Sequence, residues 1–367
     1  STGGIYPPNF RQNHKRKYEA AFGEARVPLI GKVGSAPRLL TLTIAGRHDH
    51  YSDFGSASTG QFGVEVRPVD GLTIRGAYAD AFKAPTLDDL YGSDVSYQTV
   101  LVDPVSGELA EPNVMVGGNS ALRPMSGHSH MFGVQYTTWS VPGLLLSATQ
   151  WGVEESEVIQ SVDPQVLADN ATTFPGRVIR NGAGQITEII DTEVNFGSID
   201  VAGLDYQLSY QRPIGRGTWS MAVDATEIYR YLQALVPGTQ PIGSVSKGED
   251  DGDWAPRWKG TVATGWQEDR MTAHVDGRYT GSYQDYDSEG RRIGNIWIVD
   301  ANLRWTLAGA MDRTGFWPRK SYVEAGATNL FNRSPQFSNY LYDSVGYDPT
   351  QMSIVGRTLY LRLGARW

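Results

Sequence analysis

The stretch KGEDDGDW, residues 247–254, places four carboxylates within five residues. Carboxylate oxygens at close spacing are ligands that Ca²⁺ prefers. The stretch lacks the full ligand set of a helix–loop–helix calcium site, and acidic loops are commonly just solvated. One hypothesis is that these carboxylates bind Ca²⁺, and the alternative is that they are only solvated. The residues concerned are Glu249, Asp250, Asp251 and Asp253.

Four of the six histidines form two pairs, His48/His50 and His128/His130. Two histidines at positions i and i+2 of a strand can hold a metal ion. Both pairs share the parity of apolar residues in their segments, so we expect them to point outward with those residues. We interpret them as interface residues and predict no metal site there.

Aromatic and arginine side chains are the remaining candidates for binding chemistry. Aromatic faces can stack on sugar rings, catechols or peptide side chains, and arginines can pair with carboxylates. The candidate ligand contacts are Tyr91, Tyr97, Trp254, Tyr283, Tyr286, Tyr340, Arg47 and Arg75. The alternative is that the rings pack loops together and the arginines pair with neighbouring acids.

The composition excludes several classes of protein. No catalytic constellation is evident, so we expect neither an enzyme nor a cofactor. The 367 residues include no cysteine, which excludes disulfides and thiolate metal sites. The net charge of −8 argues against a nucleic-acid partner. No apolar run reaches the roughly 18 residues of a membrane helix, but alternating membrane strands look soluble by mean hydropathy.

Apolar and polar residues alternate over most of the chain, which predicts strands. Thirteen strands are expected, at 17–30, 39–51, 58–69, 72–83, 128–141, 143–159, 201–214, 217–233, 256–268, 271–285, 293–308, 320–332 and 356–367.

The connections between these strands alternate in length. Short turns such as Asp70–Gly71 and Pro142–Gly143 alternate with the long segments 84–127, 160–200 and 234–255. Short turns at one end and long loops at the other are typical of an outer-membrane barrel. We therefore predict an all-β fold, a transmembrane antiparallel β-barrel whose long loops face outside the cell. A soluble β-sandwich is the alternative.

The last predicted strand explains why the chain ends on an aromatic residue. Leu359, Leu361 and Leu363 share one face with Trp367, and we assign that face to lipid. Trp367 would then lie at the membrane interface, where its amphipathic ring is favoured. From this position we expect Trp367 to be needed for barrel assembly rather than for ligand binding, with deletion lowering the amount of assembled protein.

Several stretches resemble one known family. GRHDHYSDFGS (46–56), LTIRGAYADAFKAPTLDDLYG (72–92) and GNSALRPMSGHSHMFGVQY (118–136) resemble conserved segments of the TonB-dependent receptors of the Gram-negative outer membrane. NFGSIDVAGLDYQLSY, TNLFNRSPQF and the final YDPTQMSIVGRTLYLRLGARW match the closing segments of that family. Lys83, Ser120 and Met125 depart from the usual residues. The resemblance covers nearly the whole chain, 1–367, as the C-terminal part of the barrel.

The resemblance implies a barrel of about 22 strands around a plug domain. No stretch here resembles the plug or the motif that couples it to TonB. We therefore expect a second chain to carry the plug and the remaining strands, and residues 1–16 to begin outside the cell. The other implied partners are the TonB complex, reached through that plug, and outer-membrane lipid and lipopolysaccharide.

The resemblance also implies energised uptake of a scarce ligand at the outer membrane. An oligosaccharide, a peptide and a ferric siderophore all remain open as that ligand. The alternative function is a structural half-barrel in a surface complex that transports nothing.

Overall fold

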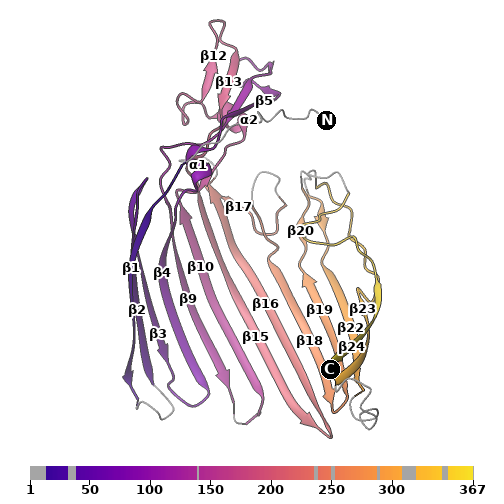
Figure 1. Cartoon of the computed structure of the whole chain (residues 1–367). Coiled ribbons are helices and arrows are strands. Elements are labelled where there is room, and N and C mark those ends of the chain that lie inside the picture. The colour runs from indigo at the N-terminus through magenta and orange to yellow at the C-terminus, as the bar shows by residue number, and fades with distance from the viewer. Residues whose placement is uncertain are drawn as a thin grey trace.

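The computed structural model describes residues 14–31, 39–138, 140–234, 239–248, 253–286, 290–307, 320–340 and 346–366. It contains one large, curved antiparallel sheet with a small lobe at one end (Figure 1). No helix among these residues is long and apolar enough to cross a membrane.

All thirteen predicted strands are confirmed. They are β1 (Tyr18–Ile30), β2 (Leu40–Tyr51), β3 (Gly55–Val66), β4 (Leu72–Lys83), β9 (Met125–Thr137), β10 (Leu144–Ser156), β15 (Ser198–Ile214), β16 (Gly217–Ala234), β18 (Trp258–Glu268), β19 (Met271–Thr280), β22 (Ile296–Thr306), β23 (Lys320–Thr328) and β24 (Thr358–Arg366). Consecutive strands in this order pair with each other, and short β17 (Ile242–Gly243) pairs with β16. Within the described residues, β1 pairs only with β2 and β24 only with β23.

The two faces of the sheet differ as the alternation predicts. On β24, Leu359, Leu361 and Leu363 are 72%, 69% and 72% exposed on the convex face. Tyr360 and Arg362 lie on the concave face, where both approach Glu324 of the neighbouring strand. Neither face of the sheet is buried against other parts of the protein. The apolar face is therefore suited to contact lipid, and the polar face is suited to line a lumen.

At the pairing of β23 with β24, two tyrosine rings pack over glycines of the opposite strand. Tyr360 is registered opposite Gly326, and Tyr322 opposite Gly364. A Cβ added at either glycine would collide with the tyrosine ring opposite. These glycines therefore make room for two lumen-facing rings that cover the strands.

Tight turns cluster at one end of the sheet. Gly71 and Gly143 occupy the left-handed region, with φ of 82° and 88°, which glycine adopts without strain. Each also accepts a backbone hydrogen bond from the adjoining strand, Thr137 N–H to Gly71 O and Gln211 N–H to Gly143 O.

The opposite end carries the long connections, and two of them form one folded lobe, residues 84–124 and 159–197 (Figure 1). Its elements are α1 (Leu87–Tyr91), β5 (Val95–Gln98), β6 (Leu101–Val102), β7 (Leu109–Ala110), β8 (Asn113–Val116), β11 (Ile159–Gln160), α2 (Pro164–Asp169), β12 (Val178–Arg180), β13 (Ile186–Ile190) and β14 (Val194–Asn195). The sequence predicted only loops here.

The lobe folds because its two segments bury a shared apolar core. Strand β13 pairs in parallel with β8, which joins residues far apart in the chain. Val114 and Ile189 are fully buried at this pairing, and Leu167 of α2 packs against them. Elements this short are stable only through such packing, which local periodicity does not reveal.

Candidate functional site

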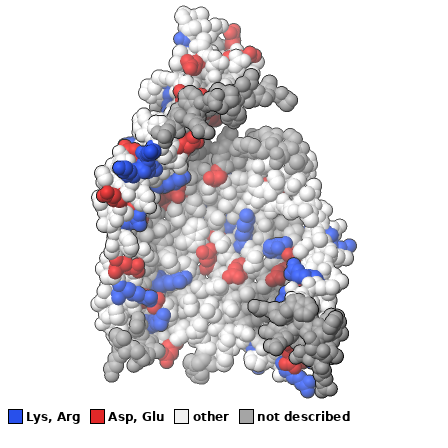
Figure 2. All heavy atoms as spheres, viewed as in Figure 1, with Lys and Arg blue, Asp and Glu red and all other residues white. Residues whose placement is uncertain are grey.

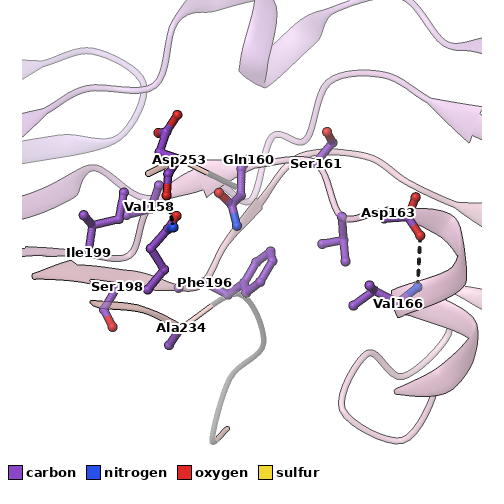
Figure 3. A pocket seen from close by; sticks show the side chains of 13 residues that line it. Val158, Gln160, Ser161, Asp163, Val166, Phe196, Ser198, Ile199, Ala234 and Asp253 are labelled. Atoms are coloured by element: carbon purple, nitrogen blue, oxygen red, sulfur yellow. Dashed lines mark hydrogen bonds between the residues drawn. The ribbon is translucent and has the colours of Figure 1, made fainter. Parts of the chain in front are cut away.

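A cavity of about 330 Å³ lies where the lobe meets the ends of β15 and β16. Figure 3 shows the Phe196 ring and the Gln160 side chain between the strand ends and the helix α2. Its volume is at the lower end of the range for small-molecule sites, about 300–1,000 Å³. The cavity is therefore a candidate site for one small group of a ligand.

Hydrogen bonds fix the walls of this cavity. Gln233 is 4% exposed and pairs in register with Ile199 of β15. Its amide donates to Ser244 Oγ at 3.0 Å and to the Asp253 carbonyl. On the opposite wall, Asp163 accepts the amide protons of Gln165 and Val166 and so caps α2.

Three polar side chains that line the cavity have free hydrogen-bonding groups among the described residues. None of the hydrogen bonds between described residues uses the side chains of Gln160, Ser161 or Ser198. Among the described residues, no lysine or arginine lines the cavity, whereas Asp163 and Asp253 do. The site can therefore donate to and accept from a neutral polar group, and it offers no cation to an anion.

Four of the predicted ligand contacts come together in a second cluster. Tyr283 and Tyr286 are 0% and 2% exposed, and Trp254 and Tyr340 pack on them. The Tyr283 hydroxyl donates to buried Asp348 at 2.9 Å. Burial raises the pKa of Tyr286 to about 12, and burial also raises the pKa of Tyr283. These rings join three loops, so a ligand would reach Tyr283 and Tyr286 only if the loops parted.

The other predicted aromatics lie apart from that cluster. Tyr91 stacks on His14 with ring centroids 4.1 Å apart. Tyr97 is 45% exposed on β5, at the edge of the lobe sheet. Both belong to the lobe, and a ligand role for either stays a prediction.

Arg47 and Arg75 line the concave face of the sheet. Arg47 forms a bidentate ion pair with Asp49, in which its Nε and Nη2 each donate to a carboxylate oxygen at 2.7 Å. Arg75 lies beside Thr149 in a larger hollow of the lumen wall. Basic and acidic side chains are interspersed over this hollowed face (Figure 2).

Part of the predicted site lies outside the described residues, namely Glu249, Asp250, Asp251 and Trp367. Asp253 is described and borders the cavity. Among the described residues, no three side chains of His, Asp or Glu are grouped so as to hold a metal ion. The calcium hypothesis and the assembly role of Trp367 stay predictions.

Sequence reasoning missed the cavity residues Gln160, Ser198 and Gln233. They lie in three segments of the chain, and only Ser198 falls in a stretch that carries the resemblance, NFGSIDVAGLDYQLSY, which assigned it no role. The other signal was their position, since Gln160 and Ser198 lie within the long connection 160–200 and Gln233 directly precedes the long connection 234–255.

Comparisons with known proteins agree with the fold. The model of the family "TonB dependent receptor-like, beta-barrel" matches residues 1–353. A mutant of the ferric enterobactin receptor PfeA from Pseudomonas aeruginosa superposes with a TM-score of 0.66 at 17% identity, over 99% of this chain and 47% of that one. The siderophore receptor PirA from Acinetobacter baumannii gives 0.65 at 14% identity, over 95% and 45%.

A third solved structure, the copper transporter OprC, has a TM-score of 0.54 at 13% identity, over 95% of this chain and 48% of that one. No curated protein matches the sequence. The chain spans about half the length of the solved proteins to which it is similar.

The sheet, with its apolar outer face and polar lumen, has the fold of a membrane β-barrel wall. The chain belongs to the TonB-dependent receptor family. It is accordingly a protein of the Gram-negative outer membrane, in a family of receptors and transporters.

Proposed function

We propose that this chain forms the wall and mouth of a receptor that binds a scarce extracellular ligand and imports it with energy from TonB. The ligand classes are an oligosaccharide, a peptide or a ferric siderophore, and no enzymatic step is involved. One observation carries the proposal. The lumen wall has charged side chains around a hollow, and the folded lobe at its end contains a cavity. A half-barrel with only a structural role would need neither the charged lumen wall nor the cavity.

The proposed receptor is completed by strands outside this sequence. Strands β1 and β24 each have one partner among the described residues, so their outer N–H and C=O groups need others. In hydrocarbon each unpaired group costs several kcal/mol, which quickly exceeds the roughly 5–15 kcal/mol of a folded protein's stability. A barrel of about 22 strands would take about nine more. We propose that a second chain supplies them with the plug.

The seams can be tested with cysteine pairs. In the proposed arrangement, Tyr18 and Ala20 lie at one seam and Leu361 and Leu363 at the other. Ala20→Cys with Leu361→Cys should not form a disulfide, whereas each single cysteine, labelled with a thiol-reactive photo-cross-linker, should cross-link to the completing strands. Ala25→Cys with Ile44→Cys, which are registered partners, provides the positive control. A disulfide between Ala20→Cys and Leu361→Cys would show direct closure of this sheet.

Uptake is tested with the complete receptor in living cells. Labelled neutral oligosaccharides, short peptides and ferric siderophores are offered to cells with and without TonB. Accumulation of one ligand that disappears without TonB supports the proposed function. If the receptor is assembled but no ligand accumulates in a TonB-dependent way, the structural half-barrel is the better interpretation.

A further inference from the structure

We propose that the cavity beneath the lobe captures an uncharged, hydroxyl-rich group, such as a terminal sugar residue of a neutral glycan. The inference rests on the proposed function and narrows its ligand class. It assigns direct contacts to Gln160 and Ser198, and it makes the mouth unfavourable to anions.

The hydrogen-bonding groups of the cavity match hydroxyl groups. A sugar hydroxyl both donates and accepts, and so do an amide and a serine hydroxyl. The side chains of Gln160, Ser161 and Ser198 line the cavity and form no hydrogen bond with a described residue, and Asp253 also borders the cavity. The Gln233 amide ties β16 to Ser244 and Asp253, and Ser198 of β15 lies in register opposite the next residue of β16, Ala234.

An apolar side completes the cavity. Phe196 is 6% exposed and is held by an edge-on contact with Phe174, with ring centroids 5.5 Å apart. Val166 of α2 lies on the same side (Figure 3). Sugar rings present C–H groups as well as hydroxyls, so a wall that is part apolar and part amide suits them better than it suits an ion.

The charges around the cavity disfavour anions. The lobe contains eleven Asp and Glu residues, three arginines and no lysine. Each arginine is engaged: Arg180 pairs with Asp103, Arg123 with Glu157, and Arg177 donates to the carbonyls of Ile190 and Thr192. An anionic ferric tris-catecholate would therefore meet carboxylates and no available guanidinium in the lobe.

The shape of the cavity argues against an extended peptide. Peptides are commonly bound along a free strand edge or in a long groove. This cavity is compact, and its lining comes from the ends of β15 and β16, from α2 and from the segment between β10 and α2.

Binding to the purified complete receptor tests the inference. The probes are neutral gluco-, xylo- and arabino-oligosaccharides, a short cationic peptide and a ferric tris-catecholate, each measured by isothermal titration calorimetry. Gln160→Ala and Ser198→Ala should each weaken binding of the preferred oligosaccharide about fivefold, and the double variant more than tenfold, as expected for lost hydrogen bonds. Gln98→Ala and Ser96→Ala, on exposed β5, are matched controls and should bind as the parent does.

The outcomes separate this inference from the proposed function. No binding of any oligosaccharide, tighter binding of the catecholate or peptide, or unchanged oligosaccharide binding by the folded double variant would each overturn the sugar site. TonB-dependent uptake of another ligand would leave the proposed function intact. Oligosaccharide binding that responds to Gln160→Ala without TonB-dependent uptake would support the site and contradict the transport function.

Discussion

The carboxylate of Asp103 accepts two hydrogen bonds from the guanidinium of Arg180, at 2.6 and 2.8 Å, across 77 residues of sequence. The pair joins the hairpin of β6 and β7 to strand β12, and Asp103 is 3% exposed. Two loops of the barrel are thus tied by one charged pair near the tip of the lobe.

Because Asp103 and Arg180 form an ion pair, we predict that the stability of the β6–β7 hairpin depends on pH. Its hydrogen bonds with Arg180 lower the pKa of Asp103 to about 2. Because the folded-state pKa lies below the ordinary value of about 3.9, the stabilisation is fully present above that value and is lost as pH falls towards about 2. Amides 103–110 should lose hydrogen-exchange protection over this range, after correction for chemical exchange rates.

Asp103→Asn should give the same loss of protection at neutral pH, because the amide keeps the shape and removes the charge. Glu108→Gln is the control, since Glu108 lies in the same hairpin without an ion pair to a described residue. Equal protection in Asp103→Asn and the parent protein at pH 7 would show that the pair does not hold the hairpin.

A second prediction concerns the loop cluster around Asp348. Tyr283→Phe removes the hydroxyl that donates to this carboxylate, which is 2% exposed. A buried acceptor that loses a partner costs about 1–3 kcal/mol, so the amides of 281–286 and 346–352 should exchange about fivefold to a hundredfold faster. Tyr347→Phe, outside the cluster, should change little. Unaltered exchange in Tyr283→Phe would mean that Asp348 does not depend on this bond.

A third prediction concerns the fit of tyrosine over glycine at the last strand. Gly364→Val places a branched side chain under the Tyr322 ring, and such overpacking costs about 1–3 kcal/mol. The outer membrane should contain less heat-modifiable protein. Gly46→Ala, on a strand paired on both sides, should be assembled normally, because the nearest atom to the added Cβ is the Thr59 carbonyl oxygen at 4.0 Å. Similar amounts of both variants would contradict the proposed fit.

A fourth prediction concerns the direction of the chain through the membrane. Peptide tags inserted at Gly107 and Gly184 should be labelled on intact cells, since both glycines lie in open turns of the lobe. Gly248 is a poor insertion point, because it lies against the Tyr286 ring, and Gly290 in an open turn replaces it. Labelling only after permeabilisation would place these loops in the periplasm.

The sequence alone determined the sheet. Each strand shows its two faces through the identity of every second residue, as Leu359, Leu361 and Leu363 do against Tyr360 and Arg362. Turn residues such as Gly71 then set where each strand ends. Both signals are local, because the bilayer outside and the polar lumen inside act on every strand in the same way.

Only the tertiary structure decided what the long loops do. Val114 and Ile189 form a core because β8 and β13 meet in parallel, and Tyr283 is buried because Trp254 and Tyr340 of other loops pack on its cluster. Gln160 and Ser198 likewise share a cavity through the packing of the lobe on the rim. Such contacts depend on long-range packing of segments without periodicity, so no local pattern in the sequence records them.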